Sequence, residues 1–199
     1  SPVFNDCQGI ERFLQEGIAE QTVLVVGDIM LDRYYFGEVK RISPEAPVPI
    51  TRITQEQSTL GGAANVASNL ALLGAKVMLA GIAGQDESRR QLEKLLLAAG
   101  INYQGIVDDK RPTTTKLRVL GGHQQMIRLD FEDNNPVAGK AQASLQEYIG
   151  TMIRSRQVQA VIISDYAKGV CSVPLCKYLV KECVKGEIPL IIDPKGMDW

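Results

Sequence analysis

The sequence lacks the residue clusters on which zinc sites depend. Among 199 residues there is one histidine, His123, and no Cys-x-x-Cys pair. Structural zinc sites use cysteines and histidines grouped at short spacings, so a zinc site is not expected. The four cysteines form no evident disulfide framework, which favours reduced thiols and a cytoplasmic protein; they are Cys7, Cys171, Cys176 and Cys183.

Three short catalytic signatures are also missing. No Gly-x-Gly-x-x-Gly, no Gly-x-x-x-x-Gly-Lys-Ser/Thr and no Gly-x-Ser-x-Gly occurs. The first two hold phosphates on glycine-rich turns, and the third presents a nucleophilic serine. Their absence argues against a standard dinucleotide-binding fold, a P-loop and a Ser-His-Asp hydrolase. The hydrolase is further disfavoured because His123 falls in a predicted hairpin.

Long apolar runs and charge excess are absent as well. No stretch approaches 18 uninterrupted apolar residues, and the first residues do not resemble a secretory signal. A formal net charge of −1 gives no general attraction to nucleic acid or to an anionic membrane. The content of 45% hydrophobic residues is typical of a globular domain. We therefore expect a globular protein with neither nucleic acid nor a membrane as its partner.

What is present is an alternation of buried strands and amphipathic helices. Continuous apolar runs predict strands at 22–28, 76–82, 160–166 and 189–193, because strands of a parallel sheet are covered on both faces. Apolar residues at helical spacing predict helices at 7–20, 86–99, 138–155 and 172–185, and another after residue 62. The alternation predicts an α/β fold with a mostly parallel sheet.

Three of the predicted strands finish with an acid. Asp28, Asp165 and Asp193 stand at these ends, and Lys168 and Lys195 follow the last two. Ligands gather at the carboxyl ends of strands in open α/β sheets, and acids beside amines suit metal-bound phosphate chemistry. Asp is also a common turn residue. That explanation stays open for Asp28, and equally for Asp32, which follows the first strand.

Gly61 and Gly62 open a predicted helix after a proline-interrupted loop, in the run Gly-Gly-Ala-Ala-Asn. Glycine allows a ligand or another strand to approach the backbone closely, and the first helical turn offers free N–H groups. The pattern is therefore typical of a polar binding site, although close packing of helix on sheet explains it equally well.

Two segments predict a smaller sheet that projects from the main domain. Residues 33–54 are aromatic, then alternate, and contain prolines that an edge strand tolerates. Residues 113–132 alternate around Gly121-Gly122, which indicates a hairpin. One face of this hairpin is expected to hold Lys116, Arg118, Arg128 and Asp130. Such a row is either solvated or suited to a phosphate-bearing substrate. An uncovered edge also favours a homodimer.

These motifs together resemble the ribokinase-type (PfkB) carbohydrate kinases. The resemblance rests on Gly-Asp-Ile-Met-Leu-Asp-Arg-Tyr (27–34), Arg-Ile-Ser-Pro-Glu-Ala-Pro-Val-Pro (41–49) and Gly-Gly-Ala-Ala-Asn-Val-Ala (61–67). Thr-Lys-Leu-Arg-Val-Leu (115–120), Ile-Arg-Leu-Asp-Phe-Glu (127–132), Ser-Asp-Tyr-Ala-Lys-Gly (164–169) and Ile-Asp-Pro-Lys-Gly (192–196) extend it. Within the family, the sequence is most similar to the heptose 7-phosphate kinases of ADP-heptose synthesis.

The resemblance implies a reaction and a set of site residues. ATP, with Mg²⁺, would phosphorylate the anomeric hydroxyl of a heptose 7-phosphate, beneath a lid built from about 33–54 and 114–131. Sugar contacts would come from Asp32, Gly61, Gly62 and Asn65, with Lys116, Arg118, Arg128 and Asp130 around the sugar and its phosphate. Asp165, Lys168, Asp193 and Lys195 would lie near the nucleotide phosphates. The metal ligands stay unassigned.

The sequence departs from the family pattern in three places. It lacks the Gly-Ala-Gly-Asp helix start that carries the family's catalytic base, and it lacks the Asn-x-x-Glu segment linked to Mg²⁺ and nucleotide. Residues 84–89 lack the last glycine of a Gly-x-Asp-x-x-Gly pattern. The resemblance therefore predicts that residues 1–199 are the N-terminal portion of one kinase domain, with the base beyond Trp199 and no activity alone. A non-catalytic sugar-phosphate-binding or dimerisation module and a kinase for another sugar remain alternatives.

Overall fold

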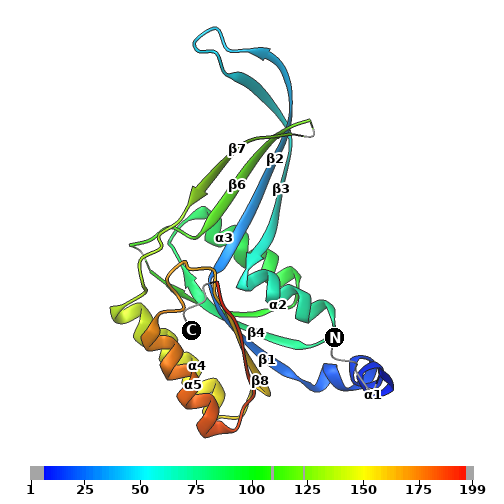
Figure 1. Ribbon diagram of the computed structural model, residues 1–199, viewed down its shortest axis with the longest axis vertical. Helices are drawn as coiled ribbons and strands as arrows, with labels where there is room; N and C mark the ends of the chain where they lie inside the picture. The colour runs from blue at the N-terminus through cyan, green and yellow to red at the C-terminus, as the bar shows by residue number, and fades with distance from the viewer. Residues whose placement is uncertain (1–6, 109, 123, 196–199) are drawn as a thin grey trace.

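A computed structural model describes residues 7–108, 110–122 and 124–195, which form two sheets. The main sheet is entirely parallel and has the strand order β5-β4-β1-β8-β9. Its strands are β1 (Thr22–Gly27), β4 (Lys76–Ala83), β5 (Asn102–Val107), β8 (Ala160–Ser164) and β9 (Leu190–Asp193). Figure 1 shows this sheet in the lower half of the molecule.

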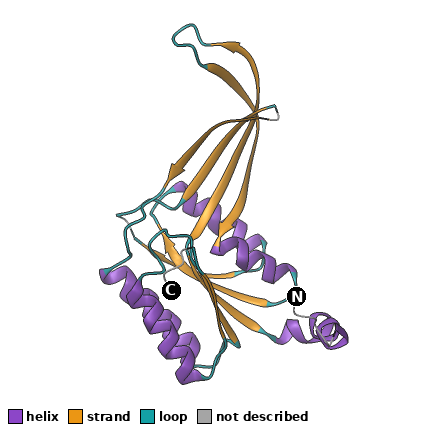
Figure 2. Ribbon diagram, in the orientation of Figure 1, coloured by secondary structure: helices purple, strands orange, loops and turns teal. Residues whose placement is uncertain are grey.

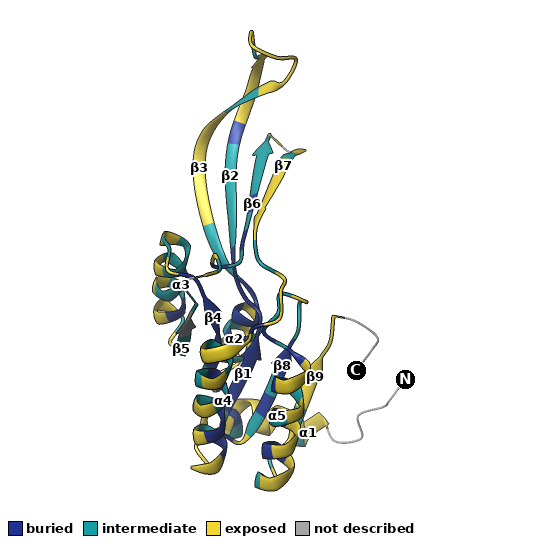
Figure 3. Ribbon diagram, turned by 90° about the vertical axis from the view of Figure 1, so that its left-hand side faces the viewer, coloured by how far each residue is buried: buried dark blue, intermediate teal, exposed yellow. Residues whose placement is uncertain are grey.

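Helices cover both faces of the main sheet (Figure 2). They are α2 (Ala63–Leu72) and α3 (Glu87–Ala98) on one face, and α4 (Gly139–Arg154) and α5 (Val173–Gly186) on the other. Alternate residues of β1 enter the two layers, with Val25 packing toward α2 and α3 and Leu24 toward α4 and α5. The predicted α/β fold with a mostly parallel sheet is confirmed. Figure 3 shows buried residues concentrated in this body.

The second sheet projects from the main body along the long axis of the molecule (Figure 1), and is called the projecting sheet below. Its strand order is β3-β2-β6-β7. The strands are β2 (Ile29–Ile42), β3 (Pro49–Gly62), β6 (Thr115–Gly121) and β7 (Gln124–Phe131). Only Asp28 separates β1 from β2, so the chain passes directly from one sheet into the other.

The bounds of the projecting sheet differ from those expected. The strands extend beyond residues 33–54, since β2 begins at Ile29 and β3 continues to Gly62. The prediction of a proline-interrupted loop before Gly61 is therefore wrong. The prolines lie in the turn between β2 and β3 and at the start of β3, and β3 continues as a strand into α2. As predicted from its proline, β3 is an edge strand.

The segment expected as one helix at 7–20 is divided into three parts. It consists of α1 (Cys7–Arg12), a π-helical turn (Phe13–Gly17) and a 3-10 turn (Ile18–Glu20). Ile18 is buried in this segment, but Ile10, Phe13 and Leu14, on which the prediction of a helix rested, are each more than 40% exposed. Among the described residues, no helix has both the length and the apolar character needed to cross a membrane.

Gly62 connects β3 to α2 in a conformation that requires glycine. Its φ of +54° and ψ of −136° lie where side chains are strongly disfavoured. A Cβ there would lie 2.2 Å from the carbonyl oxygen of Asp28. That carbonyl accepts a hydrogen bond from the N–H of Ala63 at 2.9 Å. The glycine therefore permits α2 to begin directly against the end of β1.

We expect Gly62→Ala to lower the free energy of unfolding by about 3 kcal/mol or more, because backbone strain and overlap with Asp28 add together. Gly100→Ala is the matched control: Gly100 also has a positive φ (+69°), but open space surrounds its Cβ position. It should cost about 1–2 kcal/mol. Urea unfolding of both variants measures the difference, and equal losses would contradict the crowding argument.

Candidate functional site

The three acids predicted at strand ends lie on neighbouring strands of the main sheet. Asp28, Asp165 and Asp193 follow or end β1, β8 and β9, which are adjacent in the strand order. The N–H of Asp165 donates to the carbonyl of Asp193 at 3.0 Å. The carboxyl edge of the sheet therefore brings the acids together, but each has a different environment.

Asp28 is buried, and both oxygens of its carboxylate accept hydrogen bonds from the backbone. One oxygen accepts hydrogen bonds from the N–H groups of Tyr166 (2.8 Å) and Lys168 (3.0 Å), and the other accepts from Val170 (3.0 Å). Burial raises the pKa of Asp28, although these hydrogen bonds oppose the increase. The side chain therefore fixes the loop after β8.

Among the described residues, one group of possible metal ligands forms at this edge. Ligand atoms of Asp28, Asp165 and Cys171 all lie within 4.8 Å of one another. Mg²⁺ requires near-octahedral oxygen ligands, whereas this group contains a thiol and the fully hydrogen-bonded Asp28. Asp165 also accepts from the N–H of Ala167 at 2.8 Å. The group does not fit a resident Mg²⁺.

Lys168 is held at each of its polar groups. Its N–H binds Asp28, its carbonyl accepts from Arg111 at 3.3 Å, and its ammonium lies 2.8 Å from Glu132. Both side chains of the Lys168–Glu132 ion pair are less than one fifth exposed. Burial tends to raise the pKa of Glu132, but the hydrogen bond from Lys168 holds it below its usual range.

Neither Glu132 nor Arg111 is among the site residues predicted from the sequence. Glu132 follows β7 and continues the alternation of Arg128 and Asp130, which was the available signal. The sequence around Arg111 contains no motif that would mark it as a site residue. In the structure its side chain donates to the backbone carbonyls of Lys168 and, at 2.9 Å, of Asn135. Together they fasten three loops at the carboxyl edge of the sheet.

The other predicted nucleotide-side residues are more open. Asp193 and Lys195 are both exposed. The Lys195 ammonium lies 6.0 Å from the ring centroid of Tyr166, within the range of a cation–π contact. Gly196, the last residue of one motif, and His123 lie outside the described residues.

The charged row predicted on the hairpin forms one face of the projecting sheet. Strand register places Asp32 opposite Lys116 and Arg118 opposite Arg128, and Lys116 also opposite Asp130. Residues paired in this way share a face. Arg118 donates to Asp32 at 2.7 Å, and Arg128 donates two hydrogen bonds to Asp130 at 2.9 and 3.0 Å. This set is called the charged face below.

The glycine helix start adjoins the charged face. Gly61 lies beneath Asp32, since a Cβ on Gly61 would lie 2.2 Å from Asp32 Oδ2. Gly62 precedes the first turn of α2, where Asn65 is exposed. The carboxylate and guanidinium groups of the charged face thus lie beside the glycines that lead into α2, and they offer acceptors for hydroxyls and donors for an anion.

Asp86, in the segment that departs from the family pattern, has a structural role. It caps α3 by accepting from the N–H of Arg89 at 2.9 Å, and it accepts from the N–H of Thr113 at 2.8 Å. Despite partial burial, these bonds lower the pKa of Asp86. The residue connects α3 to the linker that precedes β6.

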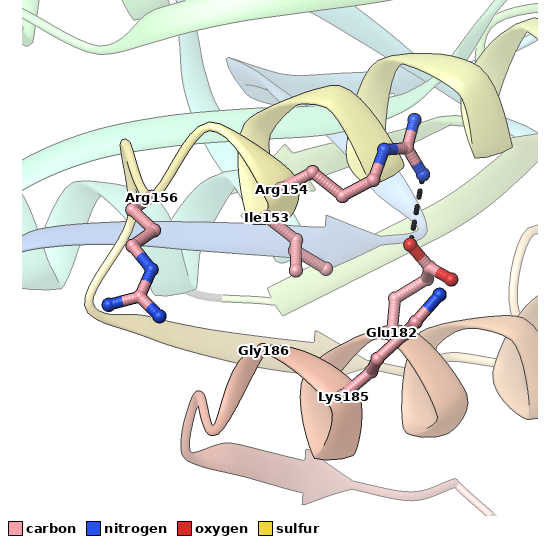
Figure 4. Close-up of a pocket in the computed structure, with 6 residues that line it drawn as sticks. All are labelled: Ile153, Arg154, Arg156, Glu182, Lys185 and Gly186. Atoms are coloured by element: carbon pink, nitrogen blue, oxygen red, sulfur yellow. Dashed lines mark hydrogen bonds and ion pairs between the residues drawn. The ribbon is translucent and has the colours of Figure 1, made fainter.

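A basic pocket lies between the C-terminal ends of α4 and α5, away from this site (Figure 4). Arg154 and Lys185 line it, with Arg156 just beyond α4. Arg154 donates to the buried Glu182 at 2.9 Å. Arg154 and Lys185 stand in the last turns of α4 and α5, where cations offset the partial negative charge of the helix ends, and this accounts for the basic lining.

The chain that forms these two sheets and this site matches one known protein family. The model of the pfkB family of carbohydrate kinases matches residues 20–196. This chain is a member of the pfkB family. The match includes both sheets, the glycine helix start and the charged face.

Curated relatives of this pfkB chain are much longer than it is. It is 49% identical over 178 residues to the bifunctional protein HldE of Methylobacillus flagellatus, covering 89% of this chain and 36% of that protein. It is 43% identical over 187 residues to the D-beta-D-heptose 7-phosphate kinase of Bordetella bronchiseptica, covering 94% and 58%. The chain therefore spans between about a third and three fifths of these relatives.

Solved structures agree on the fold. A possible 1-phosphofructokinase from Thermotoga maritima superposes with a TM-score of 0.67 at 18% identity, covering 87% of this chain and 54% of that one. At this identity the likeness shows the pfkB fold alone. The ribokinase-like architecture predicted from the sequence is confirmed.

We expect Asp28→Asn to lower the free energy of unfolding by about 1–3 kcal/mol, because the amide nitrogen would face a backbone N–H donor in a buried place. Asp193→Asn is the matched control at the exposed end of β9, and it should stay within about 0.5 kcal/mol of the parent. Urea unfolding gives both values. Equal stability of the two variants would show that Asp28 does not fix the loop.

Proposed function

We propose that this chain forms the sugar-binding part of an ATP-dependent kinase for D-glycero-D-manno-heptose 7-phosphate. The kinase would phosphorylate the anomeric hydroxyl in the synthesis of ADP-heptose, a lipopolysaccharide-core precursor. The family match, together with 43% identity to a heptose 7-phosphate kinase, supports the reaction class and the sugar. The reaction is proposed for the whole protein. The curated relatives are much longer than this chain, which covers 36% and 58% of two of them.

The observation that carries the proposal is the charged face beside the glycine helix start. A sugar phosphate needs acceptors for its hydroxyls and cations for its phosphate, close together. Asp32 and Asn65 supply acceptors, and Gly61 leaves room for the carboxylate of Asp32. Lys116 and Arg128 supply the second from the adjoining strands. Arginine suits this task because its planar donors match phosphate oxygens.

The nucleotide would approach from the carboxyl edge of β8 and β9. The ammonium groups of Lys168 and Lys195 suit the charge of a triphosphate, with Asp165 and Asp193 nearby. Mg²⁺, when bound, neutralises charge on the transferring phosphates and is held largely by phosphate oxygens in such sites. The proposal assigns it no protein ligand in this chain.

The projecting sheet would act as a lid over the sugar. Water exclusion by a closing lid prevents wasteful ATP hydrolysis and strengthens the electrostatic contacts inside. The opposite face of this sheet is apolar and exposed at Ile127, Leu129 and Phe131, which are 50%, 41% and 52% accessible. We propose that a second copy covers this face in a homodimer, and that the enzyme acts in the cytoplasm.

We expect Arg128→Glu to weaken binding of heptose 7-phosphate at least tenfold while changing the affinity for the unphosphorylated heptose less than twofold. The reason is that charge reversal repels the phosphate and leaves the hydroxyl contacts intact. Isothermal titration with the two sugars gives the ratio of dissociation constants.

Arg90→Glu controls for charge reversal at a distance, since Arg90 is an exposed, ion-paired arginine on α3. It should leave both affinities unchanged. If the parent chain binds both sugars equally, the phosphate has no site here, and a kinase for another sugar becomes the better proposal.

We expect the 199-residue chain to show no turnover of ATP with heptose 7-phosphate, because it carries none of the residues that the family uses as base. A coupled ADP-release assay measures this against a full-length heptose 7-phosphate kinase as positive control. Turnover above background by the chain alone would overturn the view that it forms only the sugar-binding part.

A further inference from the structure

Arg118 differs from the other bases of the charged face in how fully it is already engaged. Its Nη1 lies 2.7 Å from Asp32 Oδ1, and the side chains are 23% and 18% exposed. Arg128 is half exposed and pairs with Asp130 on its own strand. Arg118 therefore joins β6 to β2 in a sheltered ion pair, whereas Arg128 remains accessible.

A second contact fixes the guanidinium of Arg118. It lies over the ring of Tyr34, with Cζ 5.2 Å from the ring centroid. Nη1 is also 3.5 Å from the Tyr34 hydroxyl. The hydrogen bond to Asp32 raises the pKa of Arg118. A guanidinium held by a carboxylate and an aromatic face has little freedom to follow a ligand.

The geometry of Asp32 shows what this restraint accomplishes. Arg118 occupies Oδ1, while Oδ2 takes the space that a side chain on Gly61 would fill, 2.2 Å from that Cβ position. Oδ2 is thus directed over the glycine run that leads into α2. A carboxylate held at one oxygen and directed by the other is preorganised to accept a hydroxyl.

We propose that Arg118 is a positioning residue that orients Asp32 toward the sugar, and that it does not bind the sugar's phosphate. The inference rests on the proposed function and deepens it, because the phosphate contact then falls to Arg128 and Lys116. Alternation alone gives Arg118, Arg128 and Lys116 the same face, which is why the sequence predicts one role for all three.

The test compares the two sugars in Arg118→Met. Loss of positioning should weaken the binding of both sugars by the same factor, about tenfold. The dissociation constant of unphosphorylated heptose divided by that of heptose 7-phosphate then stays at the parent value. A phosphate-binding arginine would instead lower that ratio, as Arg128→Glu is expected to do. A lowered ratio in Arg118→Met overturns the inference.

A double-mutant cycle gives a readout that a merely structural role would not move. If Arg118 acts through Asp32, Arg118→Met should add less than a twofold loss of sugar affinity in an Asp32→Asn background. Additive losses overturn the inference. Arg118→Lys keeps the charge and serves the same cycle if the methionine variant does not fold.

Arg33→Met is the matched control. Arg33 stacks on Tyr35 at the same 5.2 Å and pairs with Glu56 at 3.7 Å, but on the opposite face of β2. Its loss should leave both sugar affinities unchanged. If the parent chain binds neither sugar, the proposed function itself fails. If the parent chain prefers heptose 7-phosphate and the Arg118 variant loses that preference, only the inference about Arg118 fails.

Discussion

The buried carboxylate of Asp28 holds the carboxyl edge of the sheet together. It accepts three backbone N–H groups from the loop after β8, and its own carbonyl accepts the first N–H of α2. A buried charge is costly unless hydrogen bonds satisfy it, and here the backbone supplies all of them. The position of Lys168 and the start of α2 both depend on this one residue, so the proposed nucleotide side and sugar side share a single support.

A second set of contacts connects the loops above this support. Glu132 follows the last strand of the projecting sheet and pairs with Lys168, while Arg111 binds carbonyls in two loops. Gly169 adds to this junction, because a Cβ there would lie 2.0 Å from the carbonyl of Asn135. These polar contacts add to the apolar connection at the base of the projecting sheet, where Ile29 and Leu31 belong to the buried core of the main body.

Much of this architecture could be predicted from the sequence, because apolar periodicity determines it. The run at 22–28 is buried on both faces as predicted, and the hairpin around Gly121 places its charges on one face. The length of β3 could not be predicted, since its polar residues are paired by backbone hydrogen bonds that leave no apolar pattern. Nor could the sequence reveal that Arg118 is engaged by Asp32, 86 positions away. Alternation of residues along a strand shows which face of the sheet a side chain occupies. Which side chains form ion pairs on that face depends on strand register, which the sequence alone does not give.

On the charged face two acids, Asp32 and Asp130, are set against three bases, Lys116, Arg118 and Arg128. Arg118 and Arg128 lie opposite each other across the register, and each is paired with a carboxylate, so two of the three positive charges are already offset. To reach Arg128, the proposed phosphate would have to exchange places with the carboxylate of Asp130. Affinity then reflects the difference between two ion pairs rather than the strength of one, which favours selective binding over tight binding.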